Sequence, residues 1–192
     1  MTQIIAFLGK GRSGKDTCGD YIIKHHKFVK YSFADPIKKA LKSIFLFSDE
    51  QLYGNKKEEI DTRWNVSPRE VMQCFGTELG QYAFMEMMPG LKKTVKERCF
   101  WVKCFELWKK EHPTTPIVIT DVRFLHEIET LLEMNATIIY ITRNMETNVR
   151  QHSSEENIPL YQEKAHYTIE NTGTLEDLYN KIDSIMNNIC VR

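Results

Sequence analysis

A nine-residue segment near the start of the chain, GKGRSGKDT at residues 9–17, constrains the fold more than any other feature of the sequence. It carries the pattern G-x-x-x-x-G-K between a continuous apolar run, residues 3–8, and a segment that can form a helix, residues 14–26. Glycines let the backbone curl so that successive N–H groups point at an anion, and the N-terminus of the helix adds partial positive charge. The order strand, glycine-rich turn, helix therefore predicts a phosphate-binding loop in an α/β fold.

The phosphate-loop interpretation gives the individual residues of this segment distinct contacts with ATP. Lys15 would reach the β- and γ-phosphates as a mobile positive charge. The backbone at Gly11, Ser13 and Gly14 would line the rest of the triphosphate. The alternative is an ordinary glycine-rich turn, but two glycines and a lysine at this spacing arise by chance in only on the order of a few per cent of such chains. The flanking strand and helix make a chance match rarer still.

One position of the loop departs from the common motif, because Asp16 stands where Ser or Thr is usual. Thr17, one residue later, could then bond the α-phosphate and contribute an oxygen to Mg²⁺. Asp16 could hold a magnesium-bound water or accept a proton from the molecule that receives the phosphoryl group. The alternative for Asp16 is a carboxylate that is favoured only by the partial positive charge of the first helical turn.

The rest of the chain alternates between predicted strands and helices. Further strands are predicted at residues 30–34, 117–119, 136–141 and 167–169, and helices at residues 37–45, 67–79, 94–110, 128–132 and 175–189. Asp35 is expected to cap the first of these helices, Ser67 and Thr174 to cap two others, and residues 48–65 to form a loop. Strands that alternate with helices indicate right-handed parallel connections. We therefore predict a P-loop NTPase fold with a three-layer α/β/α arrangement and a parallel sheet.

Four further charged residues follow predicted strands and are candidates for the same site. Asp121 comes after the run 117–119, where an acidic residue can orient Mg²⁺ across from the phosphate loop, and Arg123 lies two residues beyond. Arg143 closes the strand 136–141, and Arg150 lies about two helical turns later. Both arginines could close over the transferring phosphoryl group. A surface ion pair is the alternative for Asp121 and Arg123, and a solvated lid residue is the alternative for Arg150.

Composition narrows the classes of partner. The 26 Lys and Arg residues equal the 26 Asp and Glu residues, so no global positive field favours nucleic-acid binding. The five cysteines include no C-x-x-C pair, which argues against a disulfide framework and a structural zinc site. No apolar run approaches the roughly 18 residues that can span a bilayer, and no leader precedes the first strand. We expect a cytoplasmic protein with no membrane partner.

With these motifs the chain resembles the deoxynucleoside monophosphate kinases of tailed phages and large DNA viruses, within the P-loop kinase superfamily. The resemblance extends over most of the chain and rests on residues 9–17, 32–38, 67–80, 120–124, 152–155 and 170–173. The block FGTE, residues 75–78, best distinguishes these kinases from other P-loop kinases, because it falls in the acceptor-binding region and not in the shared ATP site. Such a kinase would act in the host cytoplasm if the source is viral.

The resemblance implies a division of the chain and roles for further residues. It implies a core of residues 1–35, 111–143 and 165–192, an acceptor-binding insertion of residues 36–110, and a lid of residues 144–164. It places Asn171 near the adenine of ATP, makes Asp16 normal for the family, and gives the acceptor contacts to Lys38, Arg69, Gln73, Thr77, Asp121 and Arg123. A solvated helix face is the alternative for Arg69 and Gln73. Gln81 stands where related sequences often carry a basic residue, so no phosphate contact is assigned there.

The expected reaction is ATP-dependent phosphorylation of deoxynucleoside 5′-monophosphates with Mg²⁺, on small-molecule substrates and without a nucleic-acid partner. One rival is a kinase similar to phosphomevalonate kinase, which shares the phosphate-loop and Asp121–Arg123 motifs but differs in the acceptor insertion. Another is a nucleotide-binding switch that transfers nothing. The apolar residues Phe84, Met85, Met87 and Met88 could form an exposed patch suited to a homodimer.

Overall fold

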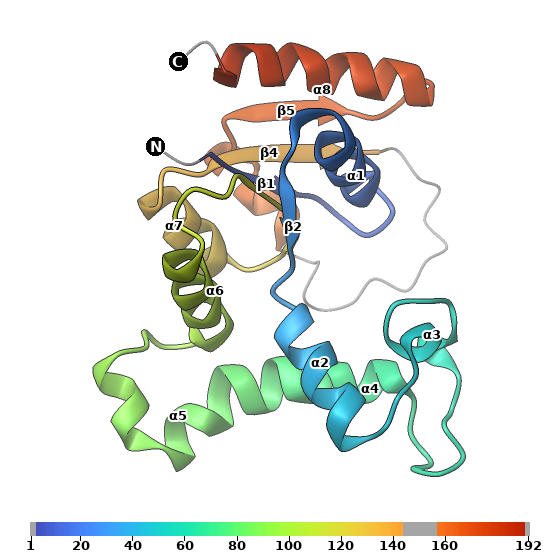
Figure 1. Cartoon of the computed structure of the whole chain (residues 1–192), viewed down its shortest axis with the longest axis vertical. Helices are drawn as coiled ribbons and strands as arrows, with labels where there is room; N and C mark the ends of the chain where they lie inside the picture. The colour runs from blue at the N-terminus through green and yellow to red at the C-terminus, as the bar shows by residue number, and fades with distance from the viewer. Residues whose placement is uncertain (1–2, 144–156, 191–192) are drawn as a thin grey trace. The chain divides into compact units, whose positions relative to one another are not determined.

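The computed structural model describes residues 3–143 and 157–190, with the side chain of Cys190 excepted. The chain divides into two compact units, which Figure 1 traces along the sequence. The first unit contains residues 1–32 and 112–192, and the second contains residues 33–111. Part of the predicted lid, residues 144–156 with Arg150, lies outside the described residues.

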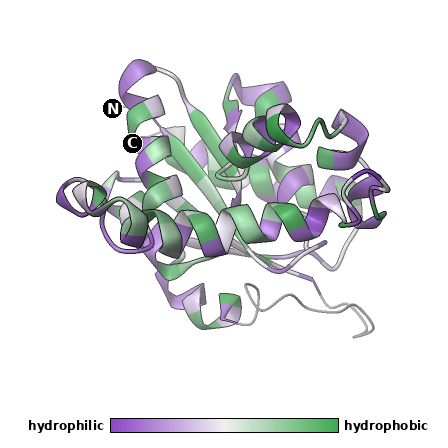
Figure 2. Cartoon of the chain, turned by 90° about the horizontal axis from the view of Figure 1, so that it is seen from below, coloured by the Kyte–Doolittle hydropathy of each residue, from purple (hydrophilic) through white to green (hydrophobic). Residues whose placement is uncertain are grey.

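The first unit is built on a five-stranded parallel sheet in the order β2-β3-β1-β4-β5. Ile5 of the central strand pairs with Val118 on one side and with Thr137 on the other. Every residue of this strand is buried, as a strand covered on both faces requires, and Figure 2 shows hydrophobic colour along the strands of the sheet. The strands are β1 (Ile4–Leu8), β2 (Val29–Tyr31), β3 (Ile117–Val122), β4 (Thr137–Thr142) and β5 (Tyr167–Glu170). The predicted parallel α/β fold is confirmed.

Helices cover this sheet through alternate residues of its strands. The helices of the first unit are α1 (Lys15–His26), α7 (Leu125–Glu133) and α8 (Leu175–Cys190), with a short 3₁₀ helix at Ile158–Lys164. Ile5 and Phe7 pack in one buried cluster with Ile22 of α1 and Ile182 of α8. Because side chains alternate along a strand, the residues between them point to the other face. The predicted cap of α8 is confirmed, since Thr174 and Asp177 exchange side-chain to backbone hydrogen bonds.

The second unit is helical. Its elements are α2 (Asp35–Ile44), α3 (Asp49–Leu52), α4 (Pro68–Gln73), α5 (Phe84–Met87), α6 (Phe100–Glu111), the 3₁₀ helices Lys56–Glu58 and Pro89–Lys93, and a π-helix, Cys74–Ala83, that joins α4 to α5. The predicted capping box at the start of α4 is confirmed, because the Ser67 and Glu70 side chains each accept the other's backbone N–H. The core of this unit is a buried cluster of Ile37, Leu41, Phe47, Leu52 and Val71.

Four local predictions for this unit were wrong. Asp35 does not cap α2 but is its first residue, behind Ala34. The helix predicted from residue 94 begins at Phe100, because Arg98 adopts a left-handed backbone with φ 61°. Residues 48–65 are not only loop, since Leu52 of α3 is buried in the core and anchors this stretch. Met85 is buried and Phe84 is partly buried, so only Met87 and Met88 of the predicted patch are exposed.

The π-helical segment packs tightly against α6. The Trp101 indole N–H donates to the carbonyl oxygen of Gly76 at 2.8 Å. A Cβ added at Gly80 would lie 2.5 and 2.6 Å from Cε2 and Cζ2 of the Trp101 ring. The absence of a side chain at Gly80 therefore sets how closely the two helices approach.

We expect Gly80→Ala to lower the free energy of unfolding by about 1–3 kcal/mol, because the added methyl must displace a packed indole. Chemical denaturation followed by Trp fluorescence measures the change. Gly90→Ala is the matched control, since nothing lies within 4 Å of a Cβ at that position. Equal stability of the two variants would show that the contact between Gly80 and Trp101 does not limit the packing.

Within the described residues, no helix combines the length and apolar character needed to cross a membrane. The four cysteines whose side chains are described, Cys18, Cys74, Cys99 and Cys104, are free thiols.

Candidate active site

The predicted phosphate loop lies between β1 and α1 and curls around the side chain of its own lysine. Gly14, the residue before α1, has a left-handed backbone with φ 111°, and no side chain caps the helix. The Lys15 ammonium donates to the carbonyl oxygens of Gly9 at 2.7 Å and Lys10 at 2.6 Å. The N-terminus of a helix without a side-chain cap favours an anion, and the lysine lies at its first turn. This arrangement suits a polyphosphate.

Asn171, which directly follows β5, forms a hydrogen bond to the phosphate loop. Its Nδ2 donates to the carbonyl oxygen of Ser13 at 2.8 Å, and its backbone N–H donates to Thr142 of β4. A Cβ at Gly14 would lie 2.7 Å from Asn171 Nδ2, so glycine is required for this approach. The Ser13 side chain is buried, and its hydroxyl has no hydrogen-bond partner among the described residues. The placement of Asn171 near adenine stays a prediction; the observed contact gives it a role in shaping the loop.

Asp16 belongs to a cluster of charges at the carboxyl ends of β2 and β3. Its Oδ1 accepts hydrogen bonds from Thr120 Oγ1 at 2.7 Å and from Lys30 Nζ at 3.0 Å. Desolvation acts to raise the pKa of Asp16, but the bonds from Thr120 and Lys30 and the charges of Lys30 and Lys15 lower it by more. The Asp16 carboxylate therefore stays ionised and fixed in position.

Asp121 reaches the same edge of the sheet through an irregularity in β3. The pairing of β1 with β3 steps from Ala6–Ile119 to Leu8–Val122, which gives β3 one extra residue at this point. Asp121 Oδ2 accepts a hydrogen bond from Ser32 Oγ at 2.6 Å. The negative charges of Asp16, Asp20 and Asp121 all help to raise the pKa of Lys30, against the lowering effect of its burial. Asp121 and Asp16 thus both act electrostatically on the Lys30 ammonium group.

Arg123 follows β3 and is held by a buried carboxyl group. Glu127 Oε2 accepts the backbone N–H groups of Arg123 at 2.8 Å and Phe124 at 3.1 Å. Burial raises the pKa of Glu127 to about 8, although the two backbone hydrogen bonds act to lower it. Glu127 thereby fixes the turn that follows β3 and carries Arg123.

This burial predicts a pH dependence of stability. The pKa of Glu127 is raised from 4.5 to about 8 on folding, so its contribution is complete below pH 4.5 and is lost as the pH rises to 8. The side chain introduced by Glu127→Gln is neutral at every pH. We therefore expect the free energy of unfolding of the variant, relative to that of the parent, to rise between pH 4.5 and 8 and to stay constant above pH 8. Urea denaturation at a series of pH values measures the difference. Glu129→Gln, at an exposed position of the same helix, should show no such gain; a constant difference for Glu127→Gln would contradict the raised pKa.

The predicted acceptor residues of the second unit line part of one helical segment. Arg69 and Gln73 lie on α4, and Thr77 lies on the π-helix that continues it; all three are partly buried. Arg69 Nε donates to Glu58 Oε1 at 2.8 Å. Lys38, on α2, lies over the ring of Tyr53 at 4.5 Å from the centroid. The structure therefore brings Arg69, Gln73 and Thr77 together on one segment and holds Lys38 on a neighbouring helix of the same unit.

The remaining predicted site residues are Thr17, Arg143 and Arg150. Thr17 lies in the first turn of α1, partly buried, beside Asp16. Arg143 is exposed and follows β4 directly. Arg150 lies outside the described residues, so its predicted role in the lid stays a prediction.

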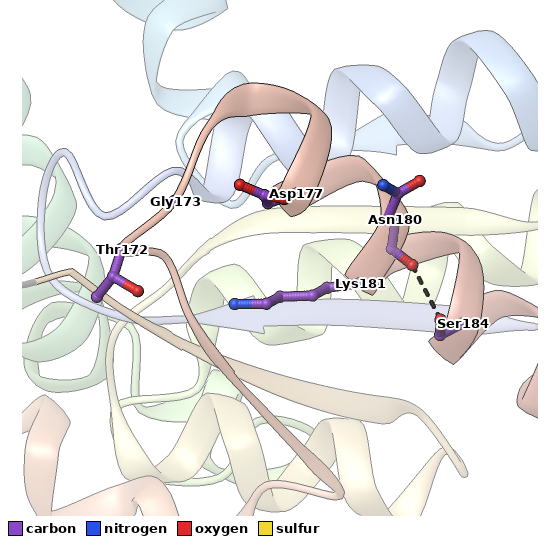
Figure 3. A pocket seen from close by; sticks show the side chains of 6 residues that line it. All are labelled: Thr172, Gly173, Asp177, Asn180, Lys181 and Ser184. Atoms are coloured by element: carbon purple, nitrogen blue, oxygen red, sulfur yellow. Dashed lines mark hydrogen bonds between the residues drawn. The ribbon is translucent and has the colours of Figure 1, made fainter.

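A shallow polar hollow of about 490 Å³ lies where the loop after Asn171 leads into α8 (Figure 3). Lys181, one of its residues, donates to the Glu170 carbonyl oxygen at 2.6 Å. The hollow is lined by Thr172, Gly173, Asp177, Asn180, Lys181 and Ser184. Its first lining residue, Thr172, follows Asn171, which bonds the phosphate loop, but no predicted catalytic residue lines the hollow.

Sequence reasoning missed four residues that shape the site: Lys30, Ser32, Thr120 and Glu127. Thr120 and Ser32 fall within the motifs on which the resemblance rests, but nothing in their spacing shows that they bond Asp16 and Asp121. Lys30 lies in a short strand with little periodicity. Glu127 stands three residues after Phe124, which lacks the side-chain oxygen of a capping box, so the sequence gives no capping signal for Glu127.

A family model and individual relatives of this chain point to the same protein family. The family model for deoxynucleotide monophosphate kinase matches residues 3–58 and 46–182. A protein of Acanthamoeba polyphaga mimivirus that carries the same kinase name is 36% identical, over 96% of each chain. The deoxynucleotide monophosphate kinase of Escherichia phage RB69 is 25% identical, over 96% of this chain and 99% of the phage protein.

Solved structures support the fold. The dephospho-CoA kinase from Campylobacter jejuni aligns over 98% of each chain with a TM-score of 0.51 and 16% identity. The shikimate kinase from Aquifex aeolicus aligns over 98% of each chain with a TM-score of 0.54 and 12% identity. At these identities the likeness extends to the architecture of the P-loop kinases and no further.

Proposed function

The chain belongs to the deoxynucleotide monophosphate kinase family, and we propose that its phosphate loop, residues 9–17, presents ATP for transfer of the γ-phosphoryl group. The family reaction is the phosphorylation of a deoxynucleoside 5′-monophosphate, with ATP as the donor. Its product, a deoxynucleoside diphosphate, is a precursor for DNA synthesis. The observation that carries the proposal is the Lys15 ammonium at the first turn of α1, inside a loop whose Gly14 has a left-handed backbone.

In the proposed mechanism the side chains of the first unit align the phosphates and neutralise their charge. Lys15 exchanges its two carbonyl partners for β- and γ-phosphate oxygens when ATP binds. A phosphate oxygen of the acceptor then attacks the γ-phosphorus, the bond from that phosphorus to the β,γ-bridging oxygen breaks, and ADP leaves. The acceptor phosphate is already nucleophilic as a dianion, so catalysis consists of in-line alignment and shielding of like charges. Arg123, Arg143 and Arg150 would supply further positive charge.

The oxygen donors of the charge cluster fit Mg²⁺. In phosphoryl-transfer sites this ion takes one or two carboxylates and completes its shell with phosphate oxygens and water. Asp16, the Thr17 hydroxyl and Asp121 would hold it directly or through water. Once bound, the ion would neutralise charge on the β- and γ-phosphates. Asp16 is ionised, as a metal ligand must be.

We assign the acceptor contacts of the second unit to Lys38, Arg69, Gln73 and Thr77. Arg69 and Lys38 supply positive charge for the phosphate, and the Gln73 amide and the Thr77 hydroxyl supply hydrogen bonds. Asp121 and Arg123 would contact the acceptor from the first unit, and Asn171 would lie near the adenine of ATP.

An acceptor screen tests the function. The protein is supplied with ATP, Mg²⁺ and, in separate reactions, each deoxynucleoside monophosphate, phosphomevalonate or no acceptor, and ADP is measured. We expect ADP formation that depends on a deoxynucleoside monophosphate. Turnover with phosphomevalonate alone would favour that rival, whereas tight ATP binding without product from any acceptor would indicate a nucleotide-binding switch.

A homodimer would use the exposed side chains of Met87 and Met88, and sedimentation of the parent and of a variant with both methionines changed to Ser would test it. The viral sources of the relatives favour action in the host cytoplasm.

A further inference from the structure

Arg98 differs from the other arginines of the second unit, residues 33–111, all of which are described. The unit contains three arginines. Arg63 is paired with the Asp61 carboxylate at 2.6 Å, and Arg69 with Glu58 at 2.8 Å. No carboxylate among the described residues pairs with Arg98. The positive charge of the Arg98 guanidinium is therefore not balanced by a carboxylate partner within the described residues.

The Arg98 side chain is nevertheless held in place by its neighbours. Nη2 donates to Gln81 Oε1 at 3.3 Å, and the guanidinium carbon lies 5.3 Å from the centroid of the Tyr82 ring. Gln81 is 3% exposed, so this contact is built into the packing. The Nε atom is shielded from water and has no hydrogen-bond partner among the described residues. A shielded donor without a partner is unfavourable, and a bound anion would satisfy it.

The backbone at Arg98 is also unusual. Its φ of 61° is in the left-handed region, which a residue with a long side chain rarely adopts. Such strain persists where the surrounding structure imposes it, and it gathers at ligand sites. Here the strained residue directly precedes buried Cys99 and the start of α6 at Phe100. The strain fixes where the guanidinium emerges.

Arg98 bonds to Gln81, which follows the predicted acceptor residues Arg69, Gln73 and Thr77 on the same segment. Arg69, Gln73, Thr77 and Gln81 follow one another at intervals of four residues along α4 and the π-helix. Four residues slightly exceed one turn of an α-helix, with about 3.6 residues per turn. In a π-helix, where hydrogen bonds reach the fifth residue, four residues fall slightly short of one turn. The two deviations oppose each other, so the polar residues stay on one side of the segment.

We infer that Arg98, held by Gln81 and Tyr82, binds the phosphate group of the deoxynucleotide acceptor. This inference rests on the proposed function for its choice of ligand. A planar guanidinium with several N–H donors recognises a phosphate by paired hydrogen bonds. Its bond to Gln81 places this phosphate contact at the Gln81 end of the segment that carries Arg69, Gln73 and Thr77.

Kinetics of Arg98→Gln test the assignment. We expect KM for the deoxynucleoside monophosphate to rise by about 10- to 100-fold, the effect of one lost hydrogen bond to a charged group, with KM for ATP changed by less than about twofold. Arg98→Lys should fall between this variant and the parent, because it keeps the charge without the planar fork. Lys92→Gln, which removes a positive charge from an exposed position of the same unit, is the matched control.

A parent value of KM for the acceptor in Arg98→Gln would overturn the inference, as would an equal rise of both KM values, which would indicate a structural role. Modification of the parent protein by phenylglyoxal, read at Arg98 by mass spectrometry, covers the case in which the variant does not fold. A deoxynucleoside monophosphate should protect Arg98, and ATP should not; protection by ATP alone, or by neither, would overturn it. If the parent transfers no phosphoryl group, the proposed function fails, while protection by the monophosphate would still support binding at Arg98.

Discussion

Lys15→Ala should lower the rate of phosphoryl transfer by about 10²–10³-fold and leave a folded protein. The ammonium group lies at the first turn of α1, where it can reach the β- and γ-phosphates and stabilise the negative charge of the transition state. In the structure this group already lies inside the loop, against the carbonyl oxygens of Gly9 and Lys10. Initial rates at saturating ATP and acceptor measure the loss, and circular dichroism verifies the fold.

Lys24→Ala provides the comparison for this variant. Lys24 is exposed on the same helix, α1, two turns beyond the loop. It should retain the parent rate. If Lys15→Ala kept activity within about tenfold of the parent, the phosphate loop would not be the site of transfer.

Gly14→Ala should weaken ATP binding by about 100-fold or more, because two separate constraints exclude a side chain there. The φ of 111° is unfavourable for any residue with a Cβ, and that Cβ would meet the Asn171 amide at 2.7 Å. The loop must then change its backbone or lose the hydrogen bond from Asn171 to the Ser13 carbonyl. Titration calorimetry with ATP measures the affinity.

The control for the loop variant is Gly90→Ala, where an added methyl meets nothing within 4 Å. A second comparison, Asn171→Ala, removes the neighbour without changing the loop sequence. It should weaken ATP binding less than Gly14→Ala, because the backbone of Gly14 stays unstrained. An unchanged ATP affinity in Gly14→Ala would show that the curled loop is not needed for binding.

The sequence allowed the sheet and the phosphate loop to be predicted because both depend on local signals. Continuous apolar runs identify strands buried on both faces, and a glycine-rich turn between strand and helix has few alternatives. The capping box of α4 and the Thr174 cap of α8 were predicted for the same reason, since their hydrogen bonds join residues three apart.

Contacts between distant segments could not be predicted. The bond from Thr120 to Asp16 joins residues 104 apart, and the bond from Ser32 to Asp121 joins residues 89 apart. Both depend on strand order and on the extra residue in β3, which no local pattern encodes. The late start of α6 depends likewise on the left-handed backbone at Arg98, for which a sequence of charged residues gives no signal.

Transfer of label from ATP to the acceptor would demonstrate the phosphoryl transfer itself. The protein is incubated with Mg²⁺, a deoxynucleoside monophosphate and ATP radiolabelled in its γ-phosphate, and the products are separated. We expect the label to move to the β-phosphate of the deoxynucleoside diphosphate, one for each ADP formed, and Lys15→Ala to slow this transfer by about 10²–10³-fold. Label that stays in ATP, or that appears only as inorganic phosphate, would contradict the proposed function.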